Sequence, residues 1–128
     1  MLETSTKYAI QAIRFLTNIP HDDYVKVSEI AKATKLPGPY LSKVFKVLAK
    51  QKLIDARRGK AGGVRVMPGK SISYLQIARV LEDPVATAAC LISKRVCSQK
   101  NACVAHSEWS KLKSQIIRFL EKQILRKQ

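Results

Sequence analysis

The sequence predicts a mainly α-helical protein with a small β-wing, in which a winged helix-turn-helix precedes a long C-terminal dimerisation helix. Three observations predict this fold class. Two short amphipathic segments are joined by a turn with proline and glycine, a basic glycine-rich stretch separates two short apolar runs, and a long amphipathic segment lies near the end of the chain. With 128 residues, 46% of them hydrophobic, the chain has the size and composition of one globular domain.

The first helix is predicted over 4–17, where apolar residues recur at spacings of three and four and form one face. Thr4 or Ser5 is expected to cap its start, because a hydroxyl oxygen accepts a hydrogen bond from a free backbone N–H of the first turn. Pro20 is expected to end it, since the residue before a proline avoids the helical conformation.

A helix-turn-helix is predicted next. Ser28 is expected to cap a brief helix that ends at Thr34, and a turn with proline and glycine follows. Pro39 suits the first turn of a second helix, which an apolar stripe extends to about residue 51. The second helix of such a pair can enter the major groove of DNA.

A wing is predicted after the second helix. The short apolar runs 53–56 and 64–66 have the pattern of strands, and the segment 57–63, with the sequence RRGKAGG, joins them as a basic hairpin. Glycine permits positive φ and a close approach to neighbouring backbone. A strand, a basic hairpin and a second strand after a helix-turn-helix predict a winged helix.

Two further helices complete the prediction. The first spans 72–82, with Ser73 as its cap, and the last runs from about His106 to about Arg126. The last helix is longer than a small winged helix can cover, so we expect a helix of a second subunit to pack against it. The residues expected at this dimer interface are Trp109, Leu112, Ile116, Phe119 and Leu120.

The chain is strongly basic. It has 24 Lys and Arg against nine Asp and Glu, a formal net charge of +15. Twelve of the 24 cations lie between residues 24 and 70, where only Glu29 and Asp55 are acidic. This excess predicts a polyanionic partner, most often nucleic acid and less often an anionic membrane surface.

Other classes of protein are disfavoured. The sequence has no paired carboxylates in a cleft, no phosphate-binding glycine loop and no Ser/His/Asp set, so an enzyme is not expected. It has no apolar run long enough to span a membrane and no secretory signal at its start. We therefore expect a cytoplasmic protein with no membrane partner.

Three cysteines, Cys90, Cys97 and Cys103, fall within 14 residues, and His106 follows with the spacing C-x6-C-x5-C-x2-H. Thiolate and imidazole ligands suit iron–sulfur clusters or zinc. Structural zinc sites use shorter cysteine gaps, whereas gaps of six and five fit a loop around a larger cluster. The spacing favours an iron–sulfur cluster, with zinc, a thiol switch and buried core cysteines as alternatives. His106 alone would be a weak signal, because a histidine at a helix start can simply cap or pack.

Motifs spread over nearly the whole chain carry a resemblance to a known family. They are Tyr8-Ala9, Ser28-Glu29-Ile30-Ala31, Tyr40-Leu41-Ser42-Lys43-Val44-Phe45, Leu53-Ile54, Arg58-Gly59-Lys60-Ala61-Gly62-Gly63, the three cysteines, His106 and Trp109. With these motifs the chain resembles the iron–sulfur cluster regulator family, the winged-helix repressors of the IscR and NsrR type. The wing together with three cysteines before a long final helix is the specific part of the match.

The resemblance implies a homodimer crossed through its C-terminal helices, with one cluster per subunit. It implies that Cys90, Cys97 and Cys103 are ligands and that His106 matches the fourth ligand of the IscR branch. In some NsrR-type members an acidic residue of the partner's first helix completes the site. The matching position here is Lys7, which cannot act as a carboxylate ligand, so [2Fe-2S] is favoured over [4Fe-4S].

The resemblance also implies a DNA-binding surface, with a recognition helix that starts near Tyr40 and with Arg58 of the wing as a minor-groove reader. Two departures concern the cluster and the wing: the first cysteine gap is six rather than the commoner five, and Lys60-Ala61 stands where many members have Pro-Gly. The residues expected at the DNA are Ser28, Pro39, Tyr40, Ser42, Lys43, Lys46, Arg57, Arg58 and Lys60.

The sequence thus predicts a DNA-binding transcriptional regulator of the repressor type. It would bind a double-stranded, pseudo-palindromic operator as a homodimer and sense redox state, nitric oxide or iron–sulfur status through its cluster. One alternative is a cluster-free nucleic-acid-binding protein with a zinc site or a thiol switch. An iron–sulfur electron carrier or enzyme is a weaker alternative.

Overall fold

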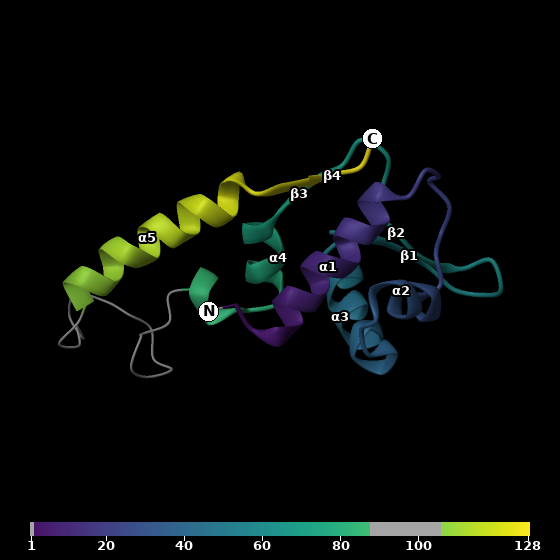
Figure 1. Cartoon of the computed structure of the whole chain (residues 1–128), viewed down its shortest axis with the longest axis horizontal. Coiled ribbons are helices and arrows are strands. Elements are labelled where there is room, and N and C mark those ends of the chain that lie inside the picture. The colour runs from purple at the N-terminus through teal and green to yellow at the C-terminus, as the bar shows by residue number, and fades with distance from the viewer. Residues whose placement is uncertain (1, 88–105) are drawn as a thin grey trace.

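The computed structural model describes residues 2–87 and 106–128 (Figure 1). Its order of elements confirms a mainly helical fold with a small wing, and in Figure 1 the long last helix and the wing lie at opposite ends of the molecule. The elements are α1 (Thr4–Asn18), α2 (Val27–Thr34), α3 (Gly38–Lys50), β1 (Asp55–Arg57), β2 (Gly63–Arg65), β3 (Ser71–Ser73), α4 (Tyr74–Val80), the short 3-10 helix η1 (Pro84–Ala86), α5 (His106–Lys122) and β4 (Ile124–Arg126).

The apolar stripes of α1, α2 and α3 meet in the main core. Ile13 of α1, Ile30 of α2 and Leu41 and Leu48 of α3 are all fully buried. In each helix the apolar residues are spaced three or four apart and form one face. Packing these faces together removes their apolar surface from water. The packing holds α3, the predicted recognition helix, against α1 and α2 and leaves its other side at the surface.

The first two helices begin differently from the prediction. The N-cap of α1 is Glu3, so Thr4 and Ser5 lie inside the helix. The side chain of Glu3 accepts no capping hydrogen bond. Instead the buried carboxylate of Asp83, far along the chain, accepts from the backbone N–H of Glu3 at 2.8 Å and from the hydroxyl of Thr6 at 2.7 Å. A tertiary contact has therefore replaced the local cap.

Ser28 is likewise not a cap. Helix α2 begins at Val27 with Lys26 as its N-cap residue, which places Ser28 within the first turn with its side chain exposed. The preceding residue, Val25, is kept extended by backbone pairing with Val64 of the wing. The helix therefore starts right after this pairing, two residues earlier than Ser28 as a cap would predict.

The capping of α4 agrees with the prediction. Ser73 accepts a hydrogen bond from the backbone N–H of Gln76 at 3.0 Å, and the Gln76 side chain accepts from the Ser73 N–H at 2.8 Å. This reciprocal pair is a capping box, which satisfies two backbone donors at the start of the helix.

Helix α5 ends at Lys122, four residues before the predicted end. The residues that follow form β4, which pairs antiparallel with β3 so that Ile72 lies opposite Leu125. Leu125 is 9% exposed and belongs to the main core, so burial in a strand outweighs the helical periodicity that continues through this segment. The strand pair brings the end of the chain back against the base of the wing.

A second, smaller core joins α4, η1 and α5. Its buried members are Leu75, Ala78, Ala86 and Leu120. Asp83 lies at its edge and also accepts a hydrogen bond from the backbone N–H of Val85 at 3.0 Å. Among the helices in the described part of the chain, none is both long and apolar enough to cross a membrane.

Asp83→Ala should lower the free energy of unfolding by about 2 to 4 kcal/mol, because it leaves three donors without their acceptor, with the Thr6 hydroxyl fully buried. Urea unfolding at neutral pH measures the change. Glu82→Gln, at the adjacent exposed carboxylate, is the control. A loss in Asp83→Ala no larger than in Glu82→Gln would contradict the role of this carboxylate.

Candidate nucleic-acid interface

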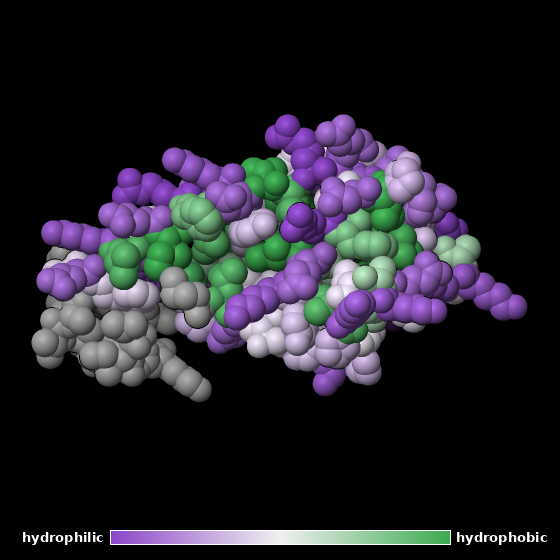
Figure 2. Space-filling view, viewed as in Figure 1, coloured by the Kyte–Doolittle hydropathy of each residue, from purple (hydrophilic) through white to green (hydrophobic). Residues whose placement is uncertain are grey.

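A groove of about 430 Å³ separates one side of α3 from the wing. Side chains of α2, α3 and the wing with its strands line this groove, and three of them, Lys46, Arg57 and Arg58, are cationic. Figure 2 shows hydrophilic side chains projecting from the end of the molecule that carries α2, α3 and the wing. The lining residues are Val27, Ser42, Phe45, Lys46, Ala49, Ala56, Arg57, Arg58, Gly63 and Val64.

All nine residues expected at the DNA are exposed in this chain. Four of them line the groove, two from α3 and two from the wing or its first strand: Ser42, Lys46, Arg57 and Arg58.

Tyr40 and Lys43 instead line a second hollow of about 520 Å³ on the other side of α3, next to the end of α4. The Tyr40 ring meets the Tyr8 ring of α1 edge to face, with centroids 5.3 Å apart. Such an arrangement favours one orientation of the tyrosine near the start of α3.

An isolated antiparallel β-bridge between Val25, which precedes α2, and Val64 of β2 attaches the wing to the helical core. The N–H of Val25 donates to the carbonyl of Val64, and the N–H of Val64 donates back to Val25, both at 2.9 Å. Gly63 makes this approach possible: it has φ +147°, and a Cβ at that position would collide with the carbonyl oxygen of Val25. At the tip, the Lys26 ammonium donates to the carbonyl of Gly59 at 2.7 Å.

A polar cluster braces the base of the wing. The Asp55 carboxylate accepts hydrogen bonds from the Tyr24 hydroxyl at 2.6 Å and from Nε of Arg65 at 2.9 Å. These two hydrogen bonds hold the pKa of Asp55 below its ordinary value of 3.8, and the one from Tyr24 has the larger effect. The same contacts with Asp55 raise the pKa of Tyr24 and the pKa of Arg65.

The Tyr24 ring also lies against two cations. The guanidinium of Arg65 is 4.8 Å from its centroid and that of Arg57 is 5.9 Å away. The sequence prediction missed Tyr24, Asp55 and Arg65, although Asp55 stands out as one of only two acids in the basic stretch. Because Arg65 pairs with Asp55, that acid is neutralised locally and the groove stays positive.

A mainly apolar groove of about 340 Å³ runs along α5, where Figure 2 shows a band of hydrophobic surface. Of the residues expected at a dimer interface, Leu112 and Phe119 are 51% and 60% exposed, and Ile116 and Trp109 are partly buried. Leu120, at 3% exposure, packs in the second core of its own chain.

The three cysteines of the predicted cluster site, Cys90, Cys97 and Cys103, lie outside the described residues, as does the side chain of His106, although its backbone begins α5. Over 2–87 and 106–128, no group of three or more His, Cys, Asp or Glu is placed to hold a metal ion. One turn beyond His106, the buried indole Nε1 of Trp109 has no hydrogen-bond acceptor among the described residues. A buried donor of this kind calls for an acceptor.

Comparison with known proteins gives one consistent result. A family model named Rrf2 and described as an iron-dependent transcriptional regulator matches residues 2–127. A protein of Aquifex aeolicus (strain VF5), named as an HTH-type transcriptional regulator, is 35% identical over 121 residues, which cover 91% of this chain and 83% of that protein.

Two solved structures share the fold. IscR of T. potens matches with a TM-score of 0.72 and 28% identity, over 98% of this chain and 82% of that one. CymR of B. subtilis, described as the global cysteine regulator, matches with a TM-score of 0.74 and 21% identity, over 98% of this chain and 92% of that one. The second likeness concerns the fold alone.

Asp55→Asn should flatten the acid limb of the stability profile. The folded-state pKa of Asp55 is lowered, so its ionised form stabilises the protein at neutral pH, and this contribution is lost as the pH falls through the lowered pKa. Urea unfolding from about pH 6 to about pH 3 measures the slope. Asp23→Asn removes the same charge without touching Tyr24 or Arg65. Equal slopes for wild type and Asp55→Asn would contradict the brace.

Proposed function

The chain belongs to the Rrf2 family of transcriptional regulators, and from this premise we propose that it binds a DNA operator through α3 and the wing, as a homodimer controlled by an iron–sulfur cluster. Its matched relatives are transcriptional regulators and not enzymes. The groove between α3 and the wing is the observation that carries the proposal, because it gathers cations from two elements on one exposed face. Such a regulator works in the cytoplasm, where the DNA is.

In the proposed complex α3 enters the major groove and the wing reaches the neighbouring minor groove. Ser42 and Lys46 face the groove from α3, where they can meet base edges or phosphates, and Arg58 extends from the wing. Tyr40 and Lys43 lie at the other side of α3 and would contact the flanking backbone. Lysine contacts with phosphates supply affinity, while α3 and Arg58 supply sequence preference.

The homodimer forms through α5. Its exposed Leu112 and Phe119 are seven residues apart, two helical turns, and therefore lie on one face of the helix. A helix of a second copy laid along this face would remove both side chains from water. Two copies related by a two-fold axis would then present two α3 helices to successive major grooves about 34 Å apart, as a pseudo-palindromic operator requires.

Cys90, Cys97, Cys103 and His106 would hold the cluster, with [2Fe-2S] favoured over [4Fe-4S]. The donor set fits, because three thiolates and one imidazole are ligands that iron–sulfur clusters use. The indole N–H of Trp109, which has no acceptor among the described residues, fits as well, since it is a donor one helical turn after His106 and the sulfurs of a cluster accept hydrogen bonds. When bound, the group would supply a centre sensitive to redox state, nitric oxide and iron supply.

A zinc site or a thiol switch at the same cysteines is the second candidate. It is favoured by the same donor set, since zinc also takes cysteine and histidine ligands. The DNA-binding surface is common to both candidates, so the identity of the metal does not alter that part of the proposal.

Removing groove cations should weaken DNA binding in two ways. Arg58→Ala should cost about 1 to 3 kcal/mol of affinity and relax sequence preference, whereas Lys46→Ala should weaken binding to all sequences and lower the slope of log K against log salt by about 1. Fluorescence anisotropy at several salt concentrations measures both, with a duplex selected by the wild-type protein from a random library. Lys111→Ala, an exposed lysine of α5, is the control. Variants that bind as the wild type does would contradict the proposed surface.

Cys97→Ala should abolish the cluster while leaving a folded dimer. Anaerobic purification followed by iron, sulfide and zinc analysis per chain measures the content, and Ser98→Ala is the matched control. We expect iron and acid-labile sulfide in the wild type and in Ser98→Ala, and neither in Cys97→Ala. A colourless wild-type protein with stoichiometric zinc would contradict the iron–sulfur cluster and favour the zinc site instead.

A further inference from the structure

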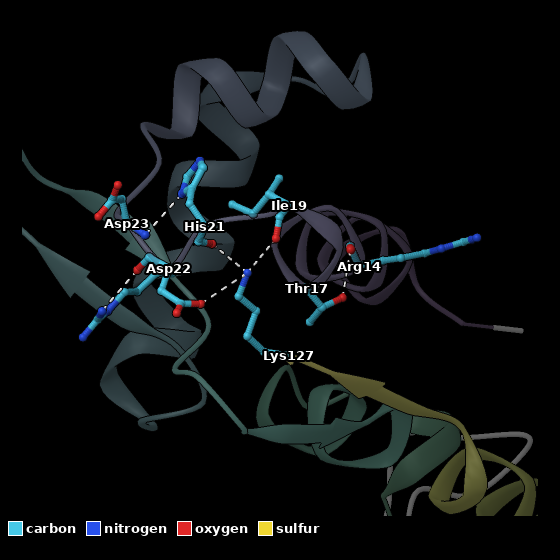
Figure 3. A network of polar contacts seen from close by, with 8 residues as sticks. Arg14, Thr17, Ile19, His21, Asp22, Asp23 and Lys127 are labelled. Carbon is cyan, nitrogen blue, oxygen red and sulfur yellow. Dashed lines mark hydrogen bonds and ion pairs between the residues drawn. The ribbon is translucent and has the colours of Figure 1, made fainter.

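One buried cation connects the last strand of the chain with the loop after α1. The side chain of Lys127 is 4% exposed, and its ammonium donates to the carbonyl oxygens of Ile19 at 2.8 Å and His21 at 2.7 Å (Figure 3). The Asp22 carboxylate lies 3.5 Å away. An ammonium group has three donors and is costly to bury without partners, so these contacts hold the loop to β4.

The loop held by Lys127 leads directly into the residues that carry the wing. Val25 pairs with Val64, and Lys26 binds the tip at Gly59. From the wing side, Nη1 of Arg65 donates to the carbonyl of Asp22 at 3.2 Å. The segment 19–26 is therefore hydrogen-bonded at its start to Lys127, directly after β4, and towards its end to the wing.

The backbone of Lys127 is fixed from the other side. Its N–H donates to the carbonyl of Lys70 at 2.9 Å, and the N–H of Gly69 donates to the carbonyl of Lys127 at 2.9 Å. The chain reaches this point directly from α5, which ends at Lys122, and Tyr74 donates its N–H to the carbonyl of Gln123 at 2.9 Å. Lys127 thus lies between the end of the long helix and the base of the wing.

We propose that Lys127 is a positioning residue for the wing, which ties the placement of the wing against α3 to the end of α5. The inference rests on the proposed function in one respect, that the wing contacts DNA. Lys127 itself is too buried to reach a phosphate, and its ammonium is already bound by two carbonyls and a carboxylate. It acts on DNA binding only through the wing, so that a shift of α5 in a dimer or beside a cluster alters the groove.

The first test needs no DNA. Lys127→Met removes the donors and keeps the length of the side chain, and Arg126→Gln removes a neighbouring exposed cation whose Nε donates only to Ser71 at 2.9 Å among the hydrogen bonds described. Amide hydrogen exchange at Val25 and Val64 should become about tenfold faster or more in Lys127→Met. This size is expected because hydrogen bonds from a charged donor, which the variant loses, are stronger than neutral ones.

Exchange at Ile13, in the core of α1, should stay unchanged in Lys127→Met, which separates release of the wing from a general loss of stability. Arg126→Gln should exchange like the wild type. If Lys127→Met fails to fold, Lys127→Gln, which keeps one amide donor group, is measured against the same control. Unchanged exchange at Val25 and Val64, or equal acceleration at Ile13, would overturn the inference.

The second test is a pair of double-mutant cycles on the selected duplex. Lys127→Met should raise the Kd for DNA in the wild-type background. The fold-change in Kd should be at least about threefold smaller in the Arg58→Ala background. In the Lys46→Ala background it should equal the wild-type fold-change within about twofold. Additivity with both variants would overturn a role through the wing. If Arg58→Ala itself leaves binding unchanged, the proposed function fails, whereas a normal Arg58→Ala loss with no effect of Lys127→Met overturns this inference alone.

Discussion

The backbone pair between Val25 and Val64 fixes how the wing lies against α3. It consists of two hydrogen bonds of 2.9 Å, and both valines are nearly buried. Each such hydrogen bond contributes only about 1 kcal/mol net, so two alone would hold a hairpin weakly. The Asp55 cluster at the base and the Lys26 contact at the tip reinforce it at its two ends. The shape of the groove depends on all three attachments.

The groove between α3 and the wing lies in the most basic part of the chain. The net charge of +15 is spread over the chain, but between residues 24 and 70 twelve cations face two acids. One of these acids, Asp55, is bound to Arg65 and serves the structure of the wing. Among the other cations of this stretch, six are exposed on α3 and the wing, where a polyanion can approach: Lys43, Lys46, Lys50, Arg57, Arg58 and Lys60. Long-range attraction of this kind supplies affinity, and the contacts made in the grooves of DNA then select among sequences.

The helices, and the exposure of the residues expected at the DNA, could be predicted because both depend on local pattern. The apolar stripe that includes Leu41 and Leu48 predicts which side of α3 is buried, and the lysines off that stripe are then exposed. Contacts between distant segments could not be predicted in this way. Strands β3 and β4 have three residues each and pair across more than fifty positions, and the Asp83 contact at the start of α1 spans 80. The wing brace was missed because its three members meet only once the hairpin has formed.

The account's central claim, that the face formed by α3 and the wing binds DNA, is tested most directly by lysine footprinting. The protein is acylated at low reagent excess with and without the selected duplex, and the modification of each lysine is measured by mass spectrometry. The account predicts strong protection of Lys46 and Lys60 by DNA, while Lys111 and Lys122, exposed on α5, keep their reactivity. Protection of the α5 lysines with Lys46 and Lys60 still reactive would contradict it.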